Sequence, residues 1–113
     1  MAAKSASKLL TNGLAVTAST TVFSDSFDAS LFTSMSFHVI QTGGATTAGV
    51  GTVQHSNDNS NWEDTTTTFT FAQTLNSLKQ ISPAGAGFYR MKIAPTTANI
   101  TSITVKALGK AGI

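Results

Sequence analysis

Hydrophobic and polar residues alternate most regularly between Thr33 and Gln41. The apolar positions fall on one side of an extended chain and the polar positions on the other: Met35, Phe37 and Val39 against Ser34, Ser36 and His38. A period of two is typical of a strand with one face on a core and one toward solvent. This segment therefore predicts the clearest strand of the chain.

Other segments share this β-rich pattern, and clusters of Gly, Asn, Ser and Thr separate them. The predicted strands are Leu14–Ala18, Thr20–Ser24, Ala48–His55, Thr65–Phe71, Phe88–Ile93 and Ile100–Leu108. Gln73–Gln80 is compatible with a short helical turn or an irregular strand. Asn12–Gly13 is a strong turn signal, because Asn and Gly both accept positive φ.

Seven or eight short strands without a clear helix predict an all-β fold, a single antiparallel β-sandwich with a jelly-roll-like arrangement. The chain has 113 residues, enough for one domain. We assign residues 9–109 to the sandwich. Residues 1–8 are expected to form a flexible N-terminal arm, and residues 110–113 a C-terminal tail.

Two packing details are expected within these segments. Phe27 should point inward from an Asp- and Ser-rich loop, with Leu31 or Phe32 as a second anchor. Gly49 and Gly51, inside a predicted strand, indicate a bulge or a close approach of another backbone.

The stretch Val53–Trp62 combines a strand end, a polar turn and the chain's single tryptophan. The side chains from Ser56 to Asn61 can hydrogen-bond nearby backbone, which favours a turn over a ladder. After this turn, the large apolar ring of Trp62 is expected to pack against the protein. The stretch is typical of a β-hairpin in an antiparallel sandwich.

Composition adds one hint about function. Only 11% of the residues are charged, whereas the chain contains 19 Thr and 13 Ser. Thr suits exposed strands, and low charge weakens repulsion between packed copies. The composition fits a protein held in an assembly, and it also fits an ordinary all-β domain.

Cysteine is absent, so a disulfide framework or a thiolate metal site is excluded. The first residues lack the apolar run of roughly 7–15 residues that a secretory signal needs, and no stretch of about 18 apolar residues could span a membrane. We therefore expect a protein that folds in the cytoplasm and has no membrane partner.

Charge is unevenly distributed along the chain. The net charge is only +2, all five acids lie in the middle, and five basic residues but no acid lie between Thr65 and Ile113. This pattern could form a basic face for an acidic partner, or an ordinary solvated surface. Nucleic-acid binding is not expected, because Arg90 and Lys92 alternate with Tyr89 and Met91 as in any half-buried strand.

No constellation of side chains indicates catalysis, so the protein is expected not to be an enzyme. Nothing places His38 or His55 beside a nucleophile and an orienting carboxylate. A calcium loop starting at Asp58 fails the D-x-[DN]-x-[DN]-G pattern, because Ser60 and Trp62 stand where Asp or Asn is required and no glycine follows. No catalytic residue, metal site or cofactor is predicted.

Two segments carry a resemblance to known proteins. Val53–Trp62 resembles the V-Q-x-S-x-D-G-x-x-W hairpin of small β-sandwich virion proteins of tailed bacteriophages and, more weakly, of discoidin-type jelly rolls. Phe88–Ile93 followed by Ile100–Gly109 resembles the paired closing strands of the same domains. The turn glycine of the motif is Asn59 here, a residue that also accepts the left-handed conformation. The chain is short for a discoidin domain and lacks its cysteines.

The phage resemblance implies a capsid decoration (cement) protein. Such a protein binds the major capsid protein lattice on the head surface and stabilises it, often as a symmetric homo-oligomer, a trimer or a dimer. It would fold in the host cytoplasm before joining the virion. The expected capsid contact is the N-terminal arm with its flanking residues, namely Ala2, Ala3, Lys4, Lys8, Leu9 and Leu10.

The alternative is a carbohydrate-binding or adhesion module of a tail or fibre. It would use an exposed loop made of Asn57, Asp58, Asn59, Asn61 and Trp62. An exposed Trp62 favours this alternative, because aromatic rings suit sugar faces, and a buried Trp62 favours the structural role. A nucleic-acid-binding barrel is a third, weaker interpretation.

Overall fold

The computed structural model describes residues 4–43, 49–72, 74–81, 87–96 and 99–111. The predicted all-β fold is confirmed over these residues. Nine strands follow in chain order: β1 (Lys4–Val16), β2 (Val22–Phe23), β3 (Phe27–Asp28), β4 (Ser34–Thr42), β5 (Gly49–Ser56), β6 (Glu63–Phe71), β7 (Thr74–Ile81), β8 (Phe88–Pro95) and β9 (Ile100–Ala111).

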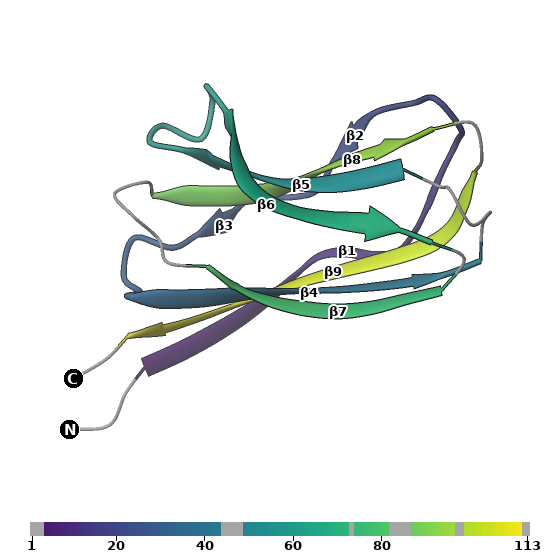
Figure 1. Ribbon diagram of the computed structural model, residues 1–113. Coiled ribbons are helices and arrows are strands. Elements are labelled where there is room, and N and C mark those ends of the chain that lie inside the picture. Colours follow the sequence, from purple (N-terminus) through teal and green to yellow (C-terminus); the bar gives the residue numbers. More distant parts are fainter. Residues whose placement is uncertain (1–3, 44–48, 73, 82–86, 97–98, 112–113) are drawn as a thin grey trace.

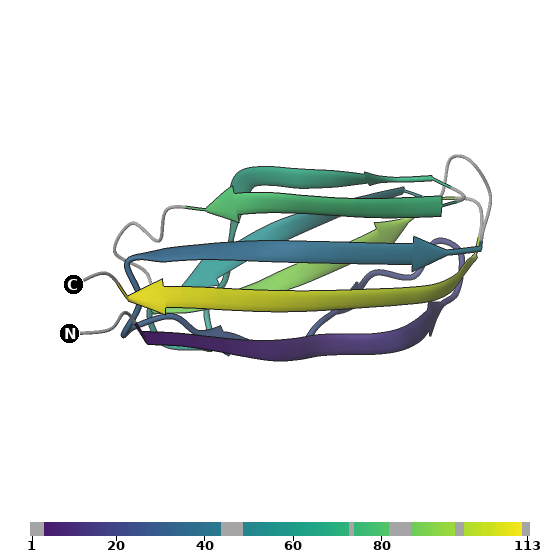
Figure 2. The same ribbon diagram turned by 90° about the horizontal axis from the view of Figure 1, so that it is seen from below.

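The strands form two antiparallel sheets packed face to face (Figure 1). The first, which we call sheet A, has the strand order β1-β9-β4-β7. Figure 2 shows this sheet face-on, with its four strands side by side. The second, sheet B, has the order β2-β8-β5-β6, with β3 also paired to β8. Except at the β2–β3 and β5–β6 connections, sequential strands cross between the layers, as in a jelly roll. The strand expected at Thr20–Ser24 is present as the short β2, and a second short strand, β3, lies along β8 where a loop was expected.

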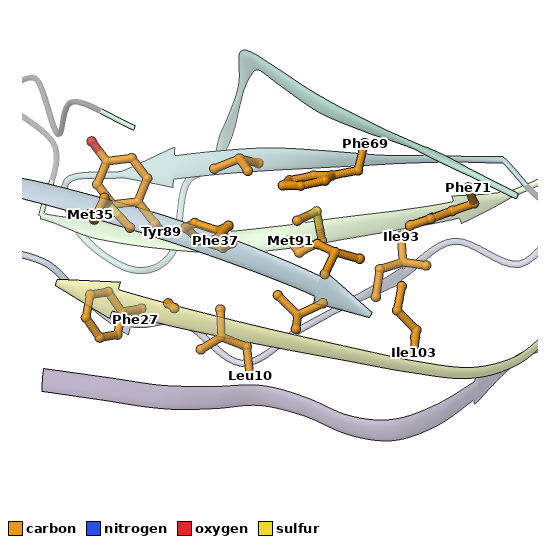
Figure 3. Close-up of a cluster of buried hydrophobic side chains, with 14 of the residues drawn as sticks. Leu10, Phe27, Met35, Phe37, Phe69, Phe71, Tyr89, Met91, Ile93 and Ile103 are labelled. Atoms are coloured by element: carbon orange, nitrogen blue, oxygen red, sulfur yellow. The ribbon is translucent and has the colours of Figure 1, made fainter. Parts of the chain in front are cut away.

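The core lies between the sheets and is filled by alternate residues of the long strands (Figure 3). The predicted inward face of β4 is confirmed, because Met35, Phe37 and Val39 are buried. Phe69 and Phe71 of β6 and the inward residues of β8 close the core from sheet B. Full burial of each such side chain stabilises the fold by about 1.5–3 kcal/mol.

The expectation of a turn at Asn12–Gly13 is wrong. β1 continues through it as an edge strand with register shifts against β9. Gly13 has a φ of +68°, so the glycine serves a bulge instead of a hairpin. Thr11 bridges the disrupted ladder: its hydroxyl donates to the Ile103 carbonyl at 2.9 Å and accepts from the Val105 amide at 3.0 Å.

Two further expectations are settled by packing. The ambiguous segment after residue 73 is strand β7, paired with β4 over its whole length. Phe27 is buried, and Phe32, not Leu31, is the second anchor: the two phenyl rings stack with centroids 5.8 Å apart, while Leu31 is 78% exposed. The expected close backbone approach at Gly49 is also present, since an added Cβ would lie 2.1 Å from the Ala94 carbonyl oxygen.

Candidate interaction surfaces

The expectation of a flexible arm is wrong for residues 4–8, because they form the beginning of β1. Lys4 pairs with Ala111 and Lys8 with Ala107 in a continuous register. For the same reason residues 110 and 111 belong to β9 and not to a tail. Residues 1–3 and 112–113, which include Ala2 and Ala3, lie outside the described part of the chain. Backbone pairing with β9, which the local sequence does not reveal, orders this segment.

This first part of β1 is an exposed strand edge. β1 is the outermost strand of sheet A, and its residues from Ser5 to Leu9 are exposed. Leu9 is 45% exposed, whereas Leu10 is a core residue with only 3% of its surface exposed. The expected capsid contact through Leu10 is therefore wrong, because its side chain is buried. The Leu10 carbonyl accepts a hydrogen bond from the Asp25 amide at 3.2 Å, and Lys8 Nζ donates to the Ser26 carbonyl at 2.9 Å.

The loop between β5 and β6 is organised by Asp58. The Oδ1 atom accepts hydrogen bonds from the Ser60 amide at 2.9 Å, the Asn61 amide at 2.8 Å and the Ser56 hydroxyl at 2.9 Å. The Asn61 side-chain amide donates to Oδ2 at 2.7 Å. These donors hold the pKa of the Asp58 carboxyl well below its usual range. The expected structural turn is confirmed, with Asn59 in the left-handed conformation at φ +59°.

Trp62 is half-buried and lies against a cation. The guanidinium carbon of Arg90 is 4.3 Å from the Trp62 ring centroid and 4.1 Å from that of Phe23. Arg90 Nε also donates to Gln54 Oε1 at 2.9 Å. Burial in this stack lowers the pKa of Arg90. We call Phe23, Arg90 and Trp62 the cation stack.

Gln54 links the cation stack to an ion pair between Asp64 and Lys92. Gln54 Nε2 donates to Asp64 Oδ1 at 2.9 Å, and Lys92 Nζ lies 2.8 Å from Asp64 Oδ2. The bonds from Lys92 and Gln54 lower the pKa of the Asp64 carboxyl. Sequence reasoning placed Arg90 and Lys92 on one face correctly, but it missed Phe23, because no local pattern links that residue to Arg90.

The two histidines lie on different sheets. His38, on the outer face of sheet A, has its Nε2 atom 2.5 Å from Asn76 Oδ1. His55, on β5, has its Nε2 atom 3.8 Å from Glu63 Oε1. Within the described residues, no three His, Asp or Glu side chains gather in a group that could hold a metal ion. The same residues contain no helix long and apolar enough to cross a membrane.

The two surfaces predicted from the sequence, the beginning of β1 and the β5–β6 loop, lie at the same end of the molecule but on different sheets. Figure 1 shows the beginning of β1 and the end of β9 at the left of sheet A, and the β5–β6 loop above them beside sheet B. An open hollow of about 410 Å³ lies beside the β1 edge, lined by Ala6 and Lys8 of β1 and by Phe27, Phe32 and Phe88. The β1 edge and the Asp58 loop are therefore separate surfaces that share an end.

Solved structures of other proteins share this fold. SPBc2 prophage-derived protein YomS matches 98% of this chain and 96% of its own length, with a TM-score of 0.67 and 13% identity. PBSX exported protein XepA matches 96% of this chain with a TM-score of 0.73 and 16% identity, and this chain spans 38% of XepA. A protein of Bacillus endospore appendages, described as disulfide-linked pili, matches 97% of this chain with a TM-score of 0.57 and 12% identity.

At these identities the likeness shows the fold alone. No protein-family model and no curated protein sequence matches the chain. The absence of cysteine means that the disulfide linkage described for the endospore pili has no counterpart here.

Proposed function

We propose that this chain is a non-enzymatic structural protein of a tailed-phage virion, and that it decorates the head by binding the major capsid protein lattice. The end-to-end fold likeness to the prophage-derived YomS supports the phage context. The Thr- and Ser-rich, weakly charged composition supports a place in an assembly.

The observation that carries the proposal is the open edge of β1. Between Ser5 and Leu9 one side of this strand pairs with β9, and in the described part of the chain no strand pairs with the other side. Such an edge can accept a strand from a partner by β-augmentation. Each new backbone hydrogen bond contributes about 0.5–1.5 kcal/mol net, so four or five of them supply useful affinity in a multi-copy shell.

The stabilising mechanism is mass action. A protein that binds the assembled lattice and not its dissociated subunits shifts the equilibrium toward the assembled shell. We further propose that the chain acts as a homo-oligomer, a trimer or a dimer, on the head surface. Light scattering on the purified chain measures that state.

The adhesion alternative is less favoured by the geometry of Trp62. A sugar platform needs a free aromatic face, and the guanidinium of Arg90 lies over the Trp62 ring at 4.3 Å. The Asp58 carboxylate of the loop is also engaged, because it accepts hydrogen bonds from the Ser56 hydroxyl, the Ser60 backbone amide and the Asn61 side-chain amide. Both features favour a structural turn.

Proline substitutions in β1 test the proposal. Successive N–H groups of a strand point to opposite sides, so one of Ala6→Pro and Ser7→Pro removes a ladder donor and the other an open-edge donor. The variant that keeps the wild-type Tm is the informative one. We expect it to lose co-sedimentation with assembled shells of the co-encoded major capsid protein.

Thr67→Pro is the matched control on the edge strand of the other sheet. Its N–H bonds to the Thr65 hydroxyl at 3.2 Å, so a proline there removes a local bond. This control should still bind the shells. Undiminished binding by the stable β1 variant would show that the edge is not the contact.

A further inference from the structure

The two sheets carry opposite charge, a feature that appears only when the strand order is known. The four strands of sheet A contain five lysines and no acid: Lys4, Lys8, Lys79, Lys106 and Lys110. All five acids of the chain lie in sheet B or in the segments that join its strands, and sheet B contains two basic residues, Arg90 and Lys92. The acidic stretch seen in the sequence thus becomes one layer of the sandwich.

Lys106 and Lys110 stand on the outer face of sheet A, whereas Lys8 and Lys79 do not. Lys8 reaches the Ser26 carbonyl beyond the β1 edge, and Lys79 Nζ binds the Thr68 carbonyl and lies 5.1 Å from the Phe69 ring centroid. Lys106 and Lys110 instead alternate with the buried residues of β9 and are exposed. Neither has an ion-pair partner among the described residues. Four residues apart on one strand, they are separated by about 13 Å.

Exposed aliphatic side chains surround these lysines. The register places Leu9, Lys106, His38 and Leu78 in one row across the sheet, from β1 to β7. Leu9 is 45% exposed and Leu78 is 62% exposed. An open hollow of about 620 Å³ lies beside this row, with Leu78, Leu108 and Lys110 among its lining residues. We call this surface, made of Leu9, His38, Leu78, Lys106, Leu108 and Lys110, the sheet A face.

We propose that the sheet A face docks onto an acidic protein surface that presents an apolar side chain flanked by carboxylates. This proposal rests on the proposed function, under which that surface belongs to the shell. The apolar side chain would enter the hollow beside Leu78 and Leu108. Two carboxylates about 13 Å apart would meet Lys106 and Lys110. This face borders the β1 edge at Leu9, so the two would bind neighbouring parts of one lattice.

Charge complementarity selects this occupant over the others. A second copy packed face to face would bring Lys106 and Lys110 against the same lysines of its partner, because a two-fold interface uses one patch twice. Nucleic acid is a poorer fit, because the exposed apolar residues are aliphatic and offer no stacking platform for bases. An acidic, partly apolar protein surface satisfies both the lysines and the leucines.

A matched pair of double variants tests the assignment on assembled shells of the co-encoded major capsid protein. Lys106→Gln with Lys110→Gln removes two positive charges from the sheet A face. Thr66→Glu with Thr70→Glu adds two negative charges at the same spacing on an exposed edge of sheet B. Both variants bring the net charge from +2 to zero, so only the location differs.

We expect K106Q/K110Q to weaken co-sedimentation about tenfold and T66E/T70E to change it less than about threefold. Leu78→Ser tests the apolar half in the same way, with Val50→Ser as control, since Val50 is 40% exposed but lies on β5 of sheet B. All variants are first compared with the wild type by Tm. Equal losses in the two charge variants would overturn the assignment, because they would reflect net charge alone.

Carbodiimide cross-linking identifies the partner directly, since it joins a lysine amine to a carboxylate in contact with it. We expect peptides that link Lys106 or Lys110 to Asp or Glu of the shell protein. Links to acids of a second copy, or shell binding that nuclease treatment abolishes, would overturn the proposed occupant. If the wild-type chain ignores the shells, the proposed function fails, whereas unchanged binding by K106Q/K110Q overturns only this face.

Discussion

Replacing Arg90 by methionine should unfold the protein at a markedly lower temperature. Methionine keeps a long apolar stem but removes the guanidinium that lies 4.1 Å from the Phe23 ring and 4.3 Å from the Trp62 ring. Two such cation–π contacts contribute about 1–2 kcal/mol together. Gln54, only 7% exposed, also loses a charged donor, which costs about 1–2 kcal/mol more.

The expected loss is therefore about 2–4 kcal/mol. A domain of 113 residues has an unfolding entropy of about 240 cal/mol/K near its midpoint, so each kcal/mol lowers Tm by about 4 °C. We expect a decrease in Tm of about 8–16 °C, measured by circular dichroism. Arg90→Lys should fall in between, because lysine keeps the charge but not the planar group that stacks on both rings.

Trp62 provides a local readout, because it is the only tryptophan of the chain. Its fluorescence emission in the folded Arg90→Met variant should differ from that of the wild type, since the cation over the ring is gone. A Tm within about 2 °C of the wild type, with unchanged emission, would refute the stacking argument. Phe23→Leu in both backgrounds then measures the coupling between the ring and the cation.

Two further predictions concern single residues. Asp58→Asn should destabilise the protein less at pH 2.5 than at pH 6. The pKa of Asp58 is lower in the folded protein, so its contribution to stability is complete above the unfolded value of about 3.8 and declines as pH falls from there toward the folded value. A urea titration at the two pH values shows whether the destabilisation narrows, and an equal destabilisation at both would contradict the role of the carboxylate. Gly49→Ala should cost about 3 kcal/mol or more, because Gly49 has a φ of +122° and its added Cβ would lie 2.1 Å from the Ala94 carbonyl oxygen. Gly87→Ala, whose Cβ would meet nothing within 4 Å, should stay within about 1 kcal/mol of the wild type, and equal losses at both glycines would contradict the steric argument.

Alternation predicted the long strands well because each has one buried and one solvated face. The β4 pattern of Met35, Phe37 and Val39 has this cause, and so does the β8 pattern around Arg90. The Asn12–Gly13 sequence does not distinguish a hairpin from a bulge, because both need a residue with positive φ. What separates them is whether the chain pairs again with the same strand, and that strand, β9, lies at the other end of the sequence.

The candidate surfaces were less predictable for the same reason. The charge asymmetry was visible as an acidic middle and a basic end, but its division between two sheets depends on the order β1-β9-β4-β7. Phe23 looked like an ordinary strand residue until β2 placed it opposite Lys92 and beside Arg90. Nothing near Lys4 or Lys8 in the sequence indicates that they pair with the last strand. Surfaces built from residues distant in sequence require the fold.

Co-sedimentation of the wild-type chain with assembled shells of the co-encoded major capsid protein tests directly whether this protein decorates a capsid. We expect saturable binding at a fixed ratio of chain to capsid subunit, and shells that survive higher temperature or denaturant when saturated. A chain that stays in the supernatant at all concentrations, and leaves shell stability unchanged, would contradict the decoration role.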